Sequence, residues 1–250
     1  MIVNNRASGW CLGVVIPARN EEDRIVGCLQ SVLSAIDACR LDNAWVVVVA
    51  DSCTDETAAR AKAALQTQGC VIECLSGSPG TARRLGVGEL LASASGLNLS
   101  KLWVANTDAD TRVPRDWLSK QLQLAHEGAC AVAGIVSVDS FQGHGLRGAE
   151  NFARRYVINA DGTHSHVHGA NIGLRADVYV DVGGWSDVAV GEDHNLWQRV
   201  RQRGWKVCSS SASVVTTSGR LHGRARGGFA DTLRQTLVAA DTYLLEGHAP

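Results

Sequence analysis

The first half of the chain alternates short apolar runs with segments of helical periodicity, and this alternation limits the fold more than any other feature. The apolar runs are Leu12–Pro17, Trp45–Ala50, Val71–Leu75 and Leu102–Ala105. Runs without polar alternation are expected of strands covered on both faces, as in a parallel sheet. With right-handed connections, this order predicts an α/β fold. Its mostly parallel central sheet is flanked by helices, and ligands bind at the carboxyl ends of the strands.

Capping residues indicate where the helices begin. Asn20 is expected to cap the first helix, with acids at 21–23 in its first turn. Thr54 or Asp55 is expected to cap the second helix, which stops near Gly69. The remaining elements are expected as helices from about 81, over 114–126, 146–158, 193–203 and 233–245, and as a strand over 131–138.

The composition argues against several functional classes. A net charge of −1 gives no electrostatic reason to bind nucleic acid or an anionic membrane. No apolar run approaches the roughly 20 residues of a membrane span, and the first residues lack the layout of a secretory signal. The eight cysteines are scattered without a C-x-x-C pair, which favours reduced thiols and predicts a cytoplasmic protein. Peripheral docking at the inner face of a membrane is left open.

The pair Asp108 and Asp110 directly follows the fourth apolar run and residues 106–107. Two carboxylates one residue apart at the end of a buried strand can bind Mg²⁺ or Mn²⁺ through oxygen, and the cation can hold a diphosphate. The alternative is a solvated acidic turn, which is disfavoured because a buried strand leads to this point. D-x-D alone is a weak signal, and its weight comes from the segments around it.

Five segments in a fixed order resemble the family 2 glycosyltransferases of GT-A fold. They are Val14–Glu21 (VVIPARNE), Val49–Asp55 (VADSCTD), Gly80–Arg84 (GTARR), the acidic pair, and the series Gly169–Asn171, Gly183–Trp185 and Gly191–Asp193. Each segment is weak alone, and together they are strong. The resemblance runs from about residue 12 to 205. Ala50 replaces the first acid of the family's V-D-D-G-S-T-D pattern, so Asp51 is expected to take that role.

The resemblance implies a metal-dependent, inverting enzyme that uses a nucleotide-sugar, with UDP as the usual nucleotide. It implies a single domain over 1–250, with a donor-binding half at 12–130 and an acceptor-binding half at 131–250. The implied donor-site residues are Pro17, Ala18, Glu21, Asp51, Gly80, Arg83, Arg84, Asp108, Ala109, Arg220 and Arg224. The implied metal ligands are Asp108, Asp110 and His222, with Mg²⁺ or Mn²⁺ as the ion. The implied acceptor-side residues are Asn171, Trp185 and Glu192, and the implied general base is Asp193.

Each of these roles has a structural alternative. The alternative for Glu21 is that it only interacts with the helix dipole, and the alternative for Asp51 is that it only forms a turn or caps a helix. Arg83 and Arg84, expected at the opening of a helix where the dipole disfavours cations, can be an ordinary exposed pair or can be compensated by a diphosphate. Asp193 can be a helix N-cap. The arginine-rich segment 218–226 can be a basic solvent loop or can close over a diphosphate.

Three histidines, His164, His166 and His168, lie on one face of an expected extended segment. They are a possible half of a zinc site, but no nearby cysteine or acid completes it. An acceptor-facing or simply exposed strand is the favoured interpretation.

Other functions remain as alternatives. A sugar nucleotidyltransferase on a related fold would open with a glycine-rich loop after the first strand, where this chain has Ala18–Glu21. The same absence argues against a nicotinamide-binding Rossmann domain. A non-catalytic nucleotide-sugar-binding module is least favoured, because both acidic segments are present. The acceptor, which can be a sugar, a metabolite or a lipid-linked molecule, and a homodimeric state are left open.

Overall fold

The computed structural model describes residues 9–145, 147–188, 190–224, 228–231 and 233. These residues form one seven-stranded sheet in the order β3-β2-β1-β4-β6-β5-β7. The strands are β1 Cys11–Ala18, β2 Ala44–Asp51, β3 Gly69–Cys74, β4 Leu102–Asn106, β5 Ala131–Val138, β6 Ile172–Arg175 and β7 Val207–Thr217. Only β6 runs antiparallel to its neighbours β4 and β5. The predicted α/β fold with a mostly parallel sheet is therefore confirmed.

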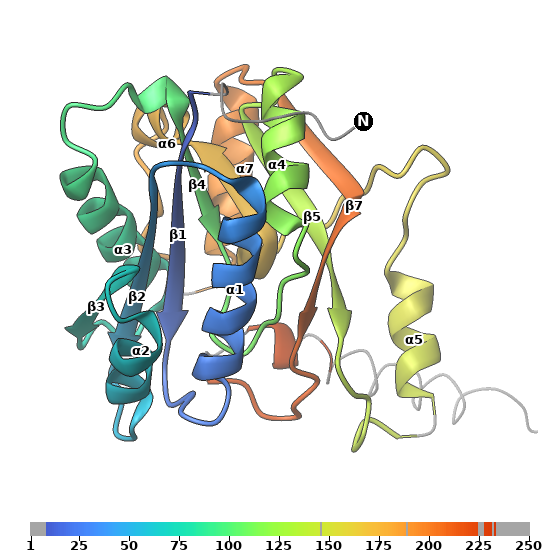
Figure 1. Cartoon of the computed structure of the whole chain (residues 1–250). Helices are drawn as coiled ribbons and strands as arrows, with labels where there is room; N and C mark the ends of the chain where they lie inside the picture. Colours follow the sequence, from blue (N-terminus) through green and yellow to red (C-terminus); the bar gives the residue numbers. More distant parts are fainter. Residues whose placement is uncertain (1–8, 146, 189, 225–227, 232, 234–250) are drawn as a thin grey trace, which may run out of the picture.

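Helices cover both faces of the sheet (Figure 1). The helices are α1 Ile25–Cys39, α2 Thr57–Leu65, α3 Pro79–Ser93, α4 Trp117–His126, α5 Gly148–Arg155, α6 Ala176–Asp181 and α7 Glu192–Gln202. Figure 1 shows α1, α2 and α4 in front of the sheet, α3, α6 and α7 behind it, and α5 beyond β5 and β7. Short 3₁₀ turns at Leu99–Lys101 and Gly169–Asn171 precede β4 and β6.

The core is divided into two layers because successive residues of each buried strand point to opposite faces. In β1, Val14 and Ile16 join the layer under α1 and α4, while Val15 faces the layer under α3. Each of these three side chains is 0% exposed. This two-sided burial explains why the strands read as continuous apolar runs instead of alternating patterns.

A buried polar network joins the sheet to α4 around Asn171, which is fully buried. Its amide nitrogen donates to the carbonyls of Ile135 (2.8 Å) and Ser213 (2.9 Å), and its side-chain oxygen accepts from Trp117 Nε1 (2.8 Å). A side chain at Gly134 would collide with this amide, so glycine leaves the room that the network needs. Asn171 thus ties β5 and β7 together where their pairing shifts register after Gly134.

The predicted helix starts are partly wrong. Asn20 does not cap α1, which begins at Ile25 without a side-chain cap, and the acids at 21–23 precede its first turn. Asn20 instead lies at φ 52° and accepts a hydrogen bond from the amide of Thr54, 34 residues away. Asp55, one of the two residues predicted to cap the second helix, accepts a hydrogen bond from the amide of Thr57, the first residue of α2, at 3.0 Å. The helix ends at Leu65, and β3 begins at Gly69.

Other boundaries agree more closely with the sequence. The predicted strand 131–138 coincides with β5, and the predicted helix 193–203 corresponds to α7 at 192–202. Apart from Leu233, the helix expected over 233–245 lies outside the described residues. In the described part of the chain, no helix has both the length and the apolar character to span a bilayer. All eight cysteines are free thiols.

Candidate active site

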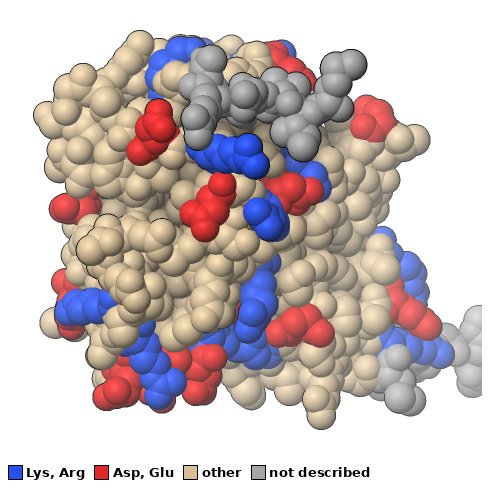
Figure 2. Space-filling model, viewed as in Figure 1, with Lys and Arg blue, Asp and Glu red and all other residues tan. Residues whose placement is uncertain are grey.

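The carboxyl ends of β1, β2 and β4 lie at the same edge of the sheet because these strands are parallel. The chain leaves these ends at residues 18, 51 and 106, so Glu21, Asp51 and the acidic pair are carried by neighbouring loops. This edge lies at the bottom of Figure 1, where the arrowheads of β1 and β2 point. Figure 2, in the same orientation, shows acidic and basic side chains close together along the lower part of the molecule.

Asp51, 5% exposed, binds the loop that leads into α3. Its carboxylate accepts hydrogen bonds from the amides of Ser76 (2.7 Å), Gly77 (2.9 Å) and Ser78 (3.1 Å) and from the hydroxyls of Ser76 (2.8 Å) and Ser52 (3.0 Å). Burial acts to raise the pKa of Asp51, but these hydrogen bonds outweigh it and hold the pKa below its ordinary value. Protein donors therefore occupy this carboxylate, and Asp51 orders the loop beside the site.

Arg83 connects the acidic pair to the start of α7. Its guanidinium donates to Asp108 Oδ1 and to Glu192 Oε1, each at 2.6 Å, and its side chain is only 4% exposed. The guanidinium also lies over the ring of Trp185, 5.1 Å from the centroid. Arg83 lies in the second turn of α3, not at its opening, and its charge is compensated by these protein carboxylates. A diphosphate is not required to explain the presence of this cation.

Glycine at two positions lets these elements approach one another. A side chain at Gly80 would meet the backbone oxygen of Ser186 at 3.0 Å and Glu192 at 3.2 Å. A side chain at Gly169 would overlap the guanidinium of Arg83. The first turns of α3 and α7 are therefore in contact next to the acidic pair.

A second cationic side chain, Arg220, is next to Asp110 and Glu21. It forms ion pairs with both carboxylates, and Arg224 approaches Glu21 at 4.0 Å. Burial is the main cause that raises the pKa of both acids, and the Arg220 charge opposes the rise. Glu21 thus faces the site and does not contribute to the first turn of α1.

The loop that carries Arg220 is held at Gly219. The amide of Gly219 donates to Asp139 Oδ1 (2.8 Å), and its carbonyl is 2.6 Å from His144 Nε2. A side chain at Gly219 would overlap the backbone of Ser140. Sequence reasoning missed Asp139 and His144, since no local pattern links them to residues about 75 positions later in the chain.

Asp193 lies in the first turn of α7, next to this cluster. The N-cap of α7 is Gly191, so Asp193 is not the capping residue. One carboxylate oxygen accepts from the amide of Gly169 (3.0 Å) and the other from the amide of His194 (2.7 Å). Burial and the neighbouring charge of Glu192 raise the pKa of Asp193, as expected of a carboxylate suited to accept a proton.

Two predicted acceptor contacts are wrong. Asn171 is 0% exposed, and its amide group is hydrogen-bonded within the core, so it cannot touch an acceptor. Trp185 is 1% exposed, and its ring lies against Arg83. Both residues support the site from beneath its surface. The third, Glu192, is partly exposed and borders the site through Arg83.

The remaining predicted residues lie at different depths. Ala18 and Ala109 are buried, while Pro17 is partly exposed at the end of β1. Arg84 is exposed on the surface of α3. His222 is exposed, and the described residues contain no group of three or more histidine, cysteine or acidic side chains arranged to hold a metal. Arg226, which sequence reasoning also placed near phosphate, lies outside the described residues.

The residues at the end of β4 nonetheless fit a hard divalent cation. Asp108 and Asp110 supply carboxylate oxygens, the donors that Mg²⁺ and Mn²⁺ prefer. Asp110 is largely buried, and Arg220 supplies the positive charge that such a carboxylate needs. A bound cation would give the same compensation.

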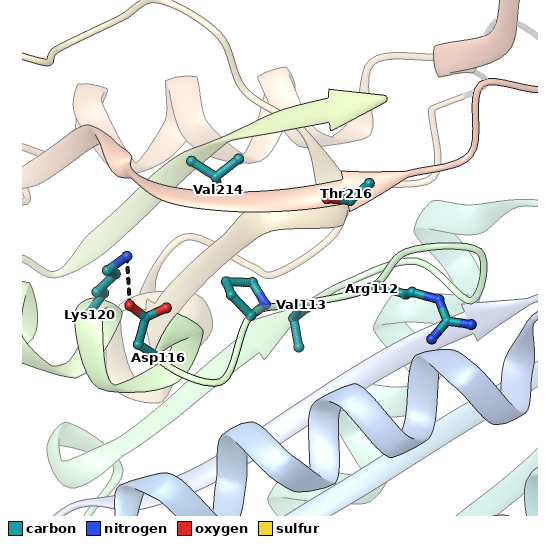
Figure 3. A pocket seen from close by; sticks show the side chains of 7 residues that line it. Arg112, Val113, Asp116, Lys120, Val214 and Thr216 are labelled. Atoms are coloured by element: carbon teal, nitrogen blue, oxygen red, sulfur yellow. Dashed lines mark ion pairs between the residues drawn. The ribbon is translucent and has the colours of Figure 1, made fainter. Parts of the chain in front are cut away.

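A separate groove of about 500 Å³ is formed by Arg112, Val113, Pro114, Asp116, Lys120, Val214 and Thr216 (Figure 3). Lys120 pairs with Asp116 at 2.9 Å along one side, as the dashed line shows, and Arg112 points toward α1. None of the predicted site residues lines this groove. The candidate site is therefore the charged edge described above.

The fold is that of the GT-A glycosyltransferases. The chain belongs to glycosyl transferase family 2, because the model of that family matches residues 13–183. The resemblance identified from the sequence is therefore confirmed, and with it the enzyme class.

Solved structures with the same fold have low sequence identity to this chain. A mannosyltransferase from Pyrobaculum calidifontis in complex with GDP-Man and Mn²⁺ matches with a TM-score of 0.63 and 21% identity, over 96% of this chain and 65% of that one. S. aureus TarS matches with a TM-score of 0.58 and 14% identity, over 83% of this chain and 36% of that one. TarS 1-349 in complex with UDP matches with a TM-score of 0.55 and 16% identity, over 83% and 60%. The chain thus spans about one third to two thirds of these proteins. A comparison with curated proteins gives no match.

Proposed function

We propose that this chain transfers a sugar from a nucleoside diphosphate sugar to an acceptor hydroxyl with inversion at the anomeric carbon. The observation that carries the proposal is the contact chain from the acidic pair through Arg83 to Glu192, with Asp193 next to it. It joins a diphosphate-binding element to a carboxylate of raised pKa within one edge of the sheet. UDP is the first nucleotide to test and GDP the second, since similar structures are described with UDP and with GDP-Man.

The donor side is assigned to the loops after β1, β2 and β4. Pro17, Ala18 and the loop ordered by Asp51 flank the nucleoside, while Gly80 and Ala109 keep the backbone close to the diphosphate. Arg220 and Arg224 are the cations that turn from Glu21 and Asp110 toward the diphosphate when it binds. Arg83 keeps Asp108 in place, and Arg84 contributes only long-range positive charge from its exposed position.

Asp108 and Asp110 would hold a Mg²⁺ or Mn²⁺ ion, with His222 reaching it only if its loop moves inward. Such an ion neutralises the charge of the leaving diphosphate. Arg220 contributes to the same neutralisation as the bond between the anomeric carbon and the diphosphate breaks.

Asp193 is the proposed general base. Its carboxylate is fixed by the amides of Gly169 and His194, so it points to one place beside the acidic pair. It accepts the proton of the acceptor hydroxyl as that oxygen attacks the anomeric carbon from the side opposite the diphosphate. The oxygen–carbon bond forms, the carbon–diphosphate bond breaks, and the nucleoside diphosphate leaves with the electron pair.

The test is release of nucleoside diphosphate from a panel of UDP- and GDP-sugars by wild type and by Asp193→Asn, with binding of the same donors followed by calorimetry. The proposal expects Asp193→Asn to bind the donor normally and to turn it over ~10²–10⁴ times more slowly. Equal turnover by both proteins would contradict an inverting mechanism with this base. Pyrophosphate release from a nucleoside triphosphate and a sugar phosphate would indicate a nucleotidyltransferase instead.

The single-domain organisation over 1–250, a cytoplasmic location and the choice between monomer and homodimer remain part of this proposal. The eight free thiols are compatible with a reducing compartment.

A further inference from the structure

A row of aromatic rings lies next to Asp193 and has no part in the donor chemistry. His164, His166 and His168 follow one another along an extended segment, and neighbouring rings in this row are 5.8 Å and 6.2 Å apart. Tyr156, which follows α5, stacks on His166 with ring centroids 4.0 Å apart and planes 2° from parallel. Phe229 packs edge-on against His168 at 5.6 Å. These contacts hold the rings in one arrangement before any ligand binds.

The row is joined to the proposed base through the backbone. His168 directly precedes Gly169, whose amide donates to Asp193 Oδ2 at 3.0 Å. On the other side, His194 follows Asp193 and is exposed, and its charge acts on both His166 and His168. His168 and His194 therefore flank, in the chain, the two residues joined by this hydrogen bond, and His166 lies next to His168 in the row of rings.

Hydrogen bonds determine which nitrogen of each ring carries its proton. The Tyr156 hydroxyl accepts from the amide of Val136 (2.8 Å), so its own proton points to His168 Nε2 at 3.0 Å. Neutral His168 then carries its hydrogen on Nδ1, which can donate. His166 Nε2 lies 3.2 Å from the carbonyl of Val157 and must donate to it, so His166 Nδ1 can accept. Within the described chain, neither Nδ1 atom has a partner.

The charge in this corner disfavours an anionic ligand. Burial lowers the pKa of His166, and it lowers that of His168 to about 3, so both rings are neutral at pH 7. Arg83 is the cation nearest to Gly169, and it faces the three carboxylates Asp108, Glu192 and Asp193. A phosphate or carboxylate on the acceptor would thus meet these three carboxylates, and Arg83, the arginine next to Gly169 in the described chain, is already paired with two of them.

We propose that His166, His168 and His194 form the acceptor subsite and bind an uncharged sugar through its hydroxyl groups, with His168 Nδ1–H donating and His166 Nδ1 accepting. The proposal depends on the proposed function, since it assigns Asp193 as the base for the sugar hydroxyl held there. A hydroxyl group both donates and accepts hydrogen bonds. A ring nitrogen that donates, next to one that accepts, can therefore bind two adjacent hydroxyl groups of a sugar ring. The single His-x-His-x-His row thus supplies hydrogen-bonding groups through His166 and His168, and not zinc ligands.

The test uses the full chain with ¹³C,¹⁵N-labelled histidine, saturated with UDP or GDP and Mg²⁺. The imidazole signals are assigned by single His→Gln variants and followed during titration with the methyl glycosides of glucose, galactose and mannose, and with glucose 6-phosphate and glucuronate. The proposal expects the signals of His166, His168 and His194 to shift with a neutral glycoside and not with the anionic sugars. His126, exposed at the end of α4, should not respond. Unmoved signals with every neutral glycoside, or larger shifts with the anions, would overturn it.

The ¹⁵N spectrum tests the hydrogen-bond assignment without a ligand. The proposal expects His168 as the Nδ1–H form and His166 as the Nε2–H form, with the His168 assignment lost in Tyr156→Phe. The reverse pattern in wild type would overturn the donor–acceptor match. In kinetic assays, His166→Gln and His168→Gln should each raise the acceptor KM about tenfold, and His126→Gln should not.

Calorimetric binding of the nucleotide in the same samples separates the two proposals. Bound nucleotide with unmoved imidazoles overturns only the acceptor subsite. Shifted imidazoles without nucleotide binding support a carbohydrate subsite and overturn the transferase. If no nucleotide binds and no imidazole signal shifts, both proposals are overturned.

Discussion

Asp51→Asn tests whether this carboxylate orders the loop between β3 and α3. Wild-type Oδ1 accepts three hydrogen bonds, and Oδ2 accepts from the Ser76 hydroxyl and the Ser78 amide. An amide nitrogen in place of Oδ2 cannot accept, so the amide of Ser78 keeps only its long contact with the Ser76 hydroxyl at 3.4 Å, and that hydroxyl can rotate. A buried donor without a partner costs about 1–3 kcal/mol, and hydrogen bonds to a neutral acceptor are weaker than those to a charged one. We expect the free energy of unfolding at pH 7 to fall by about 2–4 kcal/mol.

The loss should depend on pH in one direction. The pKa of Asp51 is lower in the folded protein than in the unfolded chain. The charged form therefore stabilises the fold fully above the unfolded value of 3.8, and this stabilisation is lost as the pH falls through the folded value. The difference between wild type and Asp51→Asn should stay constant from pH 6 to 8 and shrink below about pH 4.

Urea unfolding of both proteins across this pH range measures the effect, with Asp42→Asn as a control at an exposed acid. A difference under 1 kcal/mol at pH 7, or one that does not shrink in acid, would refute the loop-ordering role. Lost nucleotide binding with unchanged stability would instead return Asp51 to direct contact with the nucleotide.

Further substitutions test the other contacts. Asn171→Leu leaves two carbonyls and Trp117 Nε1 without partners, so the free energy of unfolding should fall by about 3–6 kcal/mol in urea titrations; a neutral effect would contradict its structural role. Arg220→Gln should weaken nucleoside diphosphate binding about tenfold by calorimetry, and unchanged affinity would exclude it from the phosphate site. Because burial raises the pKa of Asp193, kcat/KM of wild type should decline with falling pH above the ordinary aspartate range, and Asp193→Asn should lack this decline. EDTA should abolish turnover and excess Mg²⁺ or Mn²⁺ should restore it; activity that persists in EDTA would contradict a metal requirement.

The sequence predicted strands β1 to β5 because strands buried on both faces are continuous apolar runs, whereas β6 and β7 were not among the predicted strands. The strand expected at 131–138 coincides with β5, and the run ending at Ala105 extends by one residue in β4. The positions of the acids also followed from chain order, since parallel strands bring their carboxyl ends to one edge.

Contacts between distant segments were not predictable in the same way. The residue type of Asn20 predicts a helix cap, but a partner at Thr54 holds it away from the helix. Asn171 and Trp185 look like acceptor-side residues by order in the chain, yet burial decides their role, and the sequence does not show which face of the turn is covered. The ion pairs of Arg83 and Arg220 join residues 25 to 199 positions apart, so no local pattern reports them.

The most direct test of the central claim is thermal stability of wild type and Asp110→Asn with UDP, GDP and their sugars, in Mg²⁺, Mn²⁺ or EDTA. A ligand that binds only the folded protein stabilises it by about 2.7 kcal/mol at a hundredfold excess over Kd. The proposed donor site predicts a stabilisation by one nucleotide that requires the metal and disappears in Asp110→Asn. No stabilisation by any of these nucleotides would contradict the proposed function.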